Sequence, residues 1–108
     1  MALAVVADDN SPWVIPVKIQ DRQGFAWFEW DSAKDTYHSR AVMIHPEVAI
    51  TIYDVGRDEY RDIGFYAKAR VKMVEDKGDF ARYRANVHEA YINDEAYVKR
   101  GLNMEQSS

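Results

Sequence analysis

The chain of 108 residues contains no cysteine. This absence excludes a disulfide framework, a thiolate nucleophile, and any zinc or iron–sulfur site that depends on cysteine ligands. It fits a reducing compartment, and we expect a cytoplasmic protein. The length allows one domain with one modest core, which we assign to residues 1–108, with a weakly structured tail from about residue 94.

Two further absences concern membranes and nucleic acids. The longest apolar run, Ala2 to Ala7, is far shorter than the ~20 residues that a membrane-spanning helix needs. It also lacks the positively charged leader of a secretory signal. The chain has 14 basic and 18 acidic side chains, a net charge of −4, with no basic cluster interleaved with aromatic residues. We therefore expect neither a membrane nor a nucleic acid as a partner.

What the chain does contain is a high share of apolar residues in short β-type runs. Hydrophobic residues make up 47% and aromatic residues 13%, which argues against disorder. The runs at 3–7, 13–19 and 25–30 are separated by clusters of turn residues, a pattern typical of an antiparallel meander. Pro16 has no N–H to donate, so we expect it at a sheet edge or a bulge.

The apolar spacing becomes helical after residue 31. Ser32 and Asp35 have the spacing of a weak capping box, which predicts a helix that starts at Ser32. Apolar residues then recur every three or four positions up to residue 44, and Pro46 disfavours helical geometry at His45.

The remaining pattern predicts two more strands and a last helix. The strands are expected at 48–53 and 64–74, with a charged loop at 56–62 between them. A second helix is expected from Asp79, with an apolar stripe made of Phe80, Tyr83, Val87 and Tyr91. The order β-β-β-α-β-β-α, mainly β, favours a small antiparallel split barrel because closure removes exposed edges. The helix after the third strand should cap one barrel opening.

Three segments of this pattern carry a family resemblance. Trp30-Asp31-Ser32, His38-Ser39-Arg40 and the run from Pro46 to Ile50 resemble the FMN-binding split barrel of the pyridoxamine 5′-phosphate oxidase-like superfamily, of the general stress protein type. The resemblance covers residues 3–92. It implies a homodimer with FMN at the subunit interface, and a flavin phosphate held near the start of the first helix. A helix N-terminus suits such an anion because it offers unpaired N–H groups and a favourable dipole.

The resemblance also implies a set of cofactor-binding residues. Those beside the flavin ring are Pro16, Val17 and Lys18, with Trp30 as a candidate for stacking on the flavin, and those around the phosphate are Asp31, Ser32, Lys34, Thr36, Tyr37, His38 and Ser39. Where oxidases of this group carry Arg and Lys, this chain has Tyr37 and His38, which implies weaker phosphate binding. Each role has an ordinary alternative: Ser32 as a helix cap and His38 as a solvated residue.

The function implied is an FMN-dependent oxidoreductase that takes electrons from a reduced nicotinamide nucleotide and passes them to an unknown small molecule. It is related to pyridoxamine 5′-phosphate oxidase, but the substrate-binding segment of the true oxidase is missing. No catalytic residues are assigned, because no nucleophile–base arrangement or carboxylate pair is visible. The three histidines lack the spacing of a metal site. The alternatives are a non-catalytic module for haem or another flavin, and a dimeric structural protein that has lost its ligand.

Overall fold

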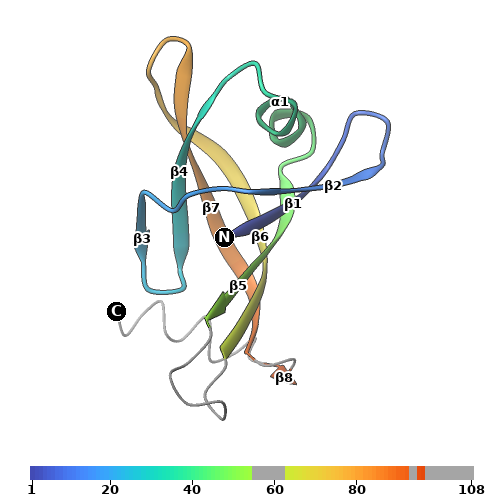
Figure 1. Cartoon of the computed structure of the whole chain (residues 1–108), viewed down its shortest axis with the longest axis vertical. Coiled ribbons are helices and arrows are strands. Elements are labelled where there is room, and N and C mark those ends of the chain that lie inside the picture. Colours follow the sequence, from blue (N-terminus) through green and yellow to red (C-terminus); the bar gives the residue numbers. More distant parts are fainter. Residues whose placement is uncertain (55–62, 93–94, 97–108) are drawn as a thin grey trace.

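The computed structural model describes residues 1–54, 63–92 and 95–96 (Figure 1). In chain order the elements are β1 (Ala2–Val6), β2 (Pro12–Pro16), β3 (Asp21–Gln23), β4 (Trp27–Ala33), α1 (Tyr37–Ile44), β5 (Glu47–Asp54), β6 (Ile63–Asp76), β7 (Phe80–Ile92) and β8 (Glu95–Ala96). All strand pairs are antiparallel. Among the described residues, no helix is long and apolar enough to cross a membrane.

One continuous stretch of chain joins the two edges of the sheet. The strand order is β2-β1-β5-β6-β7-β4-β3, with β8 added beside β7, so consecutive strands β2 and β3 lie at opposite ends. Between them, the N–H of Val17 donates to the carbonyl of Met1, and the N–H of Gln20 donates to the carbonyl of Glu29, both at 2.8 Å. The sheet therefore curves into a small barrel, which confirms the mainly β split-barrel prediction. Pro16 ends β2 at the sheet edge, as expected.

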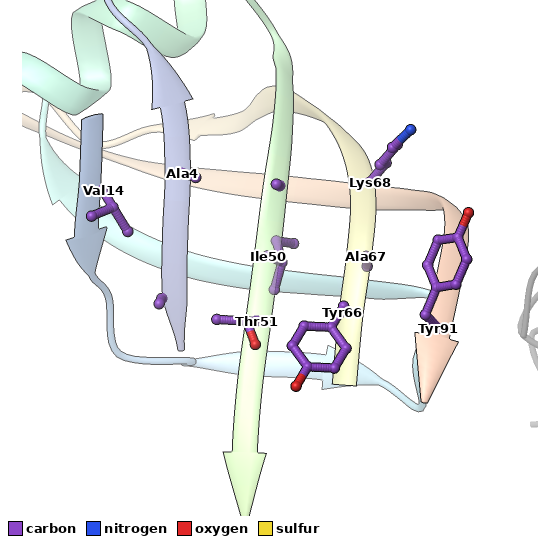
Figure 2. Close-up of a pocket in the computed structure, with 10 residues that line it drawn as sticks. Ala4, Val14, Ile50, Thr51, Tyr66, Ala67, Lys68 and Tyr91 are labelled. Atoms are coloured by element: carbon purple, nitrogen blue, oxygen red, sulfur yellow. The ribbon is translucent and has the colours of Figure 1, made fainter. Parts of the chain in front are cut away.

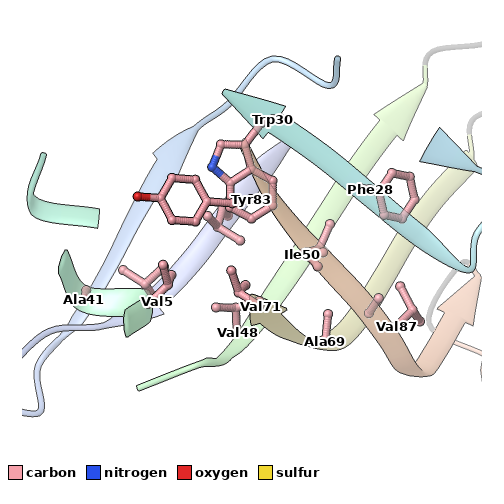
Figure 3. Packing of buried hydrophobic residues seen from close by; sticks show 14 of the residues in the cluster. Val5, Phe28, Trp30, Ala41, Val48, Ile50, Ala69, Val71, Tyr83 and Val87 are labelled. Carbon is pink, nitrogen blue, oxygen red and sulfur yellow. The ribbon is translucent and has the colours of Figure 1, made fainter. Parts of the chain in front are cut away.

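Alternating side chains of the long strands fill the barrel. On β6 the inward residues are Phe65, Ala67, Ala69 and Val71, and on β7 they are Ala81, Tyr83, Ala85 and Val87. Trp30 of β4 stacks on Tyr83, with ring centroids 6.0 Å apart (Figure 3). Helix α1 lies near one end of the barrel, where its Ala41 and Val42 join the core.

The predicted second helix was wrong, because residues 80–92 form strand β7. The helical stripe counted only large apolar side chains and passed over Ala81 and Ala85, which alternate with Tyr83 and Val87. A bulge opposite Lys68 and Ala69 then shifts the alternation, so that Val87 and Ala90 both face inward although they are three apart. This irregular spacing resembles a helical period.

Several boundaries also differ from the sequence prediction. The second strand, expected at 13–19, covers 12–16, so Val17 and Lys18 follow it. The first helix begins at Tyr37 with Thr36 as its cap, whereas Ser32 belongs to β4. Residues 21–23, expected in a loop, form β3, and the tight turn follows at Gly24, whose φ of 50° suits glycine. The third main strand covers 27–33 rather than 25–30. The predicted charged loop at 56–62 lies outside the described residues, as does most of the tail predicted from about residue 94. The described part of that tail contains β8.

Candidate functional site

The turn between β4 and α1 gathers several hydroxyl groups. Thr36 caps the helix in an extended conformation, and its Oγ1 accepts the N–H of Ser39 at 3.2 Å. The same oxygen donates to the carbonyl of Ala33 at 3.0 Å and lies 2.7 Å from Oγ of Ser39. Ser39 is 1% exposed, so its hydroxyl is fixed beneath the first turn of the helix.

His38 connects this turn to the preceding strand. Its Nε2 lies 3.1 Å from Oγ of Ser32 on β4 and 3.4 Å from Oγ1 of Thr36. The ring is half-buried, and this burial lowers the pKa of His38 below its ordinary value of 6.5. We define the helix-start cluster as Ser32, Thr36, His38 and Ser39.

The first turn of α1 also carries unpaired backbone donors. Within the part of the chain that the structure describes, no acceptor is found for the N–H groups of Tyr37 and His38. Such N–H groups at the start of a helix, together with the helix dipole, favour an anion. The helix-start cluster therefore surrounds two backbone donors with hydroxyls and one titratable ring.

The other basic side chains near this turn are engaged or directed elsewhere. Nζ of Lys34 contacts both carboxylate oxygens of Asp76, at 2.9 and 3.0 Å. Arg40 follows His38 by two positions, a rotation of roughly 200° around the helix. It lines a separate small cavity of about 140 Å³ together with Asp8. Among the described residues, His38 is therefore the basic side chain that faces the hydroxyls.

Three other predicted site residues make different contacts. Trp30 is 1% exposed in the core, and its Nε1 has no hydrogen-bond partner among the described residues. Asp31 pairs with Arg82 through two hydrogen bonds of 2.8 and 3.1 Å, and the guanidinium lowers the pKa of that carboxyl. The structure thus brings together Ser32, Thr36, His38 and Ser39, along with the backbone of Tyr37, and places Trp30, Asp31 and Lys34 in other interactions.

The predicted ring-binding residues lie on the segment that closes the barrel. Pro16 is exposed opposite Ala2 in the β1–β2 ladder, and Lys18 is also exposed. The side chain of Val17 is half-buried, and its N–H and carbonyl both pair with Met1. β2 reaches the start of the helix through Trp13, whose ring meets that of Tyr37 edge-on, with centroids 5.2 Å apart. Trp13 and Pro16 are three residues apart, roughly 10 Å along the strand.

A shallow apolar groove on the outer face of β1, β5 and β6 was missed by sequence reasoning. It has a volume of about 320 Å³. Figure 2 shows it bordered by Val14 of β2, by the rings of Tyr66 and Tyr91, and by Lys68. Its floor is made of small outward residues: Ala2, Ala4 and Ala49. The sequence feature that could have indicated this groove is the alternation of these alanines with Leu3, Val5 and Ile50, which face the core. Such alternation places the small alanine side chains together on the outer face.

A change at His38 should be visible in the pH dependence of stability. Because folding lowers the pKa of His38, the unfolded chain binds a proton more readily, and the free energy of unfolding falls as the pH drops from about 7 to about 5. Denaturant titrations of a His38→Gln variant should show a smaller decrease in this window. The same substitution at His45, at the other end of α1 and away from the hydroxyl groups, serves as the control for the exchange itself. Equal decreases in wild type and His38→Gln would contradict the assignment. The carboxylates with a lowered pKa act in a separate window below about pH 4.5; they are Asp9, Asp31, Glu47, Asp76 and Glu89.

Comparison with known proteins places the fold. No family model and no curated protein matches the chain. Similar solved structures include General Stress Protein 26 from Bacillus anthracis (TM-score 0.70, 10% identity, covering 87% of this chain and 83% of that one). Another is a candidate pyridoxamine 5′-phosphate oxidase from Listeria innocua (TM-score 0.69, 14% identity, 86% of both chains).

A haem-binding protein from Mycobacterium smegmatis is also similar, with a TM-score of 0.71 and 13% identity. The match covers 87% of this chain but 48% of the haem-binding protein, so the chain spans about half of that relative's length. These likenesses, at low identity, concern the fold. The chain has the split-barrel fold that these proteins share.

Proposed function

We propose that this chain binds FMN and that the helix-start cluster holds the phosphate. The observation that carries the proposal is the contact of His38 with Ser32 and Thr36, beside the unpaired N–H groups of Tyr37 and His38. The hydroxyl of Ser32, the two backbone N–H groups and the imidazole of His38 are groups of the kind that bind phosphate, while Thr36 and Ser39 fix the turn that presents them. The donor set therefore fits the phosphate end of FMN. The split-barrel fold supports the same assignment.

The ring of the flavin is assigned to the segment Pro16, Val17 and Lys18. Pro16 presents an exposed apolar surface, and Lys18 adds a positive charge beside it. A bound flavin would supply the redox chemistry, with a reduced nicotinamide nucleotide as donor and a small organic molecule as acceptor. The residues of this chain would bind and orient the cofactor: the helix-start cluster fixes the phosphate, and the end of β2 with the two residues after it supports the ring.

The proposed partner is a second copy of the chain, seated on the outer face of β1, β5 and β6. The groove there is almost entirely apolar, and its alanine floor allows another backbone to approach closely. Two tyrosine rings, Tyr66 and Tyr91, supply the kind of large contact that is enriched at interfaces. A homodimer of this kind would cover the groove.

The dimer can be tested with a charge placed in the groove. Ala4→Glu should give a monomer, because its carboxylate, flanked across the strands by Val14 and Ala49, would be buried without a charged partner on association. Val74→Glu adds the same charge at an exposed position on β6 outside the groove, and should remain dimeric. Sedimentation equilibrium measures the mass of each. A wild-type chain that is monomeric at micromolar concentration would refute the dimer.

FMN binding is tested by the quenching of flavin fluorescence. Tight binding of FMN with weak binding of riboflavin, which lacks the phosphate, would support the assignment and justify a test of nicotinamide-dependent reduction. Absence of FMN binding would refute it.

Haem is the second candidate, because one similar structure is a haem-binding protein. The same preparation should be titrated with haem and followed by its Soret absorbance. A clear preference for haem over FMN would favour a non-catalytic haem module. A dimer that binds neither would favour a structural role.

A further inference from the structure

We propose that His38 is a specificity-determining residue that makes phosphate binding at the helix-start cluster dependent on pH, so that FMN is preferred over riboflavin most strongly when the imidazole is protonated. The inference rests on the proposed FMN binding and concerns the charge that reads the phosphate. It follows from which donors of the cluster carry a charge.

The cluster is neutral apart from His38. Its hydroxyls and backbone N–H groups donate hydrogen bonds without a formal charge. Lys34, the nearest lysine in sequence, is held by both oxygens of Asp76. Arg40 lines the separate cavity with Asp8. Neither side chain therefore gives the cluster a permanent positive charge. The only charge that the cluster's own side chains can carry is on the titratable imidazole of His38.

Protonation of the ring also changes what Ser32 can donate. When Nε2 of His38 carries no proton, the hydroxyl of Ser32, 3.1 Å away, can donate to it. When Nε2 is protonated, it donates to that oxygen instead, and the hydroxyl hydrogen is released for another acceptor. One proton therefore provides both a positive charge and a free hydroxyl donor beside the two backbone N–H groups.

The charges on the surrounding elements are compensated or exposed. On β4, Asp31 is paired with Arg82 and Lys77. At the turn between β6 and β7, Asp76 is paired with Lys34, and the carbonyl of Asp79 accepts the N–H of Lys34. Asp35, in the turn before α1, is exposed. Burial is the cause that lowers the pKa of His38 in the free protein.

Binding of an anion changes the pKa of His38 in the direction opposite to burial. A phosphate beside the ring favours the charged form and raises the pKa of His38, so binding takes up a proton. By linkage, affinity for FMN rises as the pH falls from the pKa of the complex toward that of the free protein. Riboflavin, without the phosphate, should show no such dependence.

The experiment compares dissociation constants of FMN and riboflavin for three full-length proteins: wild type, His38→Lys and His38→Gln. From about pH 8 to about pH 6.5, wild-type affinity for FMN should rise by up to about tenfold per pH unit, the limit set by the uptake of one proton. His38→Lys should bind FMN tightly without this rise, because its charge is permanent. His38→Gln should bind FMN weakly, also without the rise.

The phosphate itself loses charge near pH 6, which weakens binding on the acid side. His38→Lys shows this contribution alone, so the difference from wild type isolates the histidine. NMR of the His38 ring protons gives a second readout, in which FMN should move the titration midpoint to higher pH.

The outcomes separate this inference from the proposed function. FMN binding with the same pH dependence in wild type and His38→Gln would overturn the role of His38 and leave the FMN site standing. A midpoint that FMN leaves unchanged would do the same. Failure of all three proteins to bind FMN at any pH would overturn the proposed function, and this inference with it.

Discussion

Replacing Ser32 and His38 together with alanine should weaken FMN binding by roughly 100-fold, because the variant loses the hydrogen bond that Ser32 donates to the phosphate and the positive charge of His38 beside it. Riboflavin binding should stay nearly unchanged, since neither side chain is assigned to the ring. Thr36 remains as the helix cap in this variant, so α1 keeps its start. Fluorescence titration with both ligands measures the two affinities.

The matched control for this variant is Lys34→Ala. It removes a neighbouring basic side chain and its ion pair with Asp76, and leaves the hydroxyls of the cluster in place. We expect it to bind FMN within a few-fold of wild type, because the ammonium group of Lys34 contacts Asp76 rather than the cluster. The fold should be kept as well, since an exposed ion pair of this kind contributes little to stability. An equal loss of FMN and riboflavin in the double variant would indicate damage to the helix rather than a lost phosphate contact.

Trp30→Ala should lower the free energy of unfolding by about 3–5 kcal/mol, the usual cost of deleting a large buried aromatic side chain. Trp30 is 1% exposed, and its ring stacks on Tyr83 at the centre of the core (Figure 3). A domain of this size has roughly 5–15 kcal/mol of stability in total. The loss should therefore appear as a large shift in a urea titration followed by circular dichroism.

Trp30→Phe is the control, because it keeps an aromatic ring in the core and removes Nε1. That nitrogen has no hydrogen-bond partner among the described residues, so its loss leaves no acceptor unpaired there. We expect a clearly smaller cost than for Trp30→Ala, because only part of the ring volume is lost and a smaller cavity remains. A Trp30→Ala variant as stable as wild type, but with weakened flavin binding, would move Trp30 from the core to the cofactor site.

Much of the fold was predictable because several segments have a clear period. In β6, Lys68, Arg70 and Lys72 alternate with residues that face the core, and this pattern is strong enough to define a strand. Proline marked both the sheet edge at residue 16 and the helix end before residue 46. In β7 the inward set includes Ala81 and Ala85, whose small side chains carry little hydrophobic signal. The larger residues alone therefore suggested a helix.

The cofactor site was predictable only to the level of its neighbourhood. Ser32 was expected as a cap at the start of the helix, but Thr36, four residues later, offers the same kind of side chain and takes that role. The ion pair of Lys34 with Asp76 joins residues 42 positions apart, which no local pattern reveals. Alternation places Trp30 and Phe28 on one face of β4, and the closure of the sheet makes that face the interior.

The measurement that tests the central claim most directly is a map of backbone amide NMR shifts as FMN is added. If the helix-start cluster holds the phosphate, the amides of Tyr37, His38 and Ser39 should move most, together with those of Val17 and Lys18. Riboflavin should move the second group and leave the first almost unchanged. Shifts confined to other parts of the barrel, or none at saturating FMN, would contradict the account.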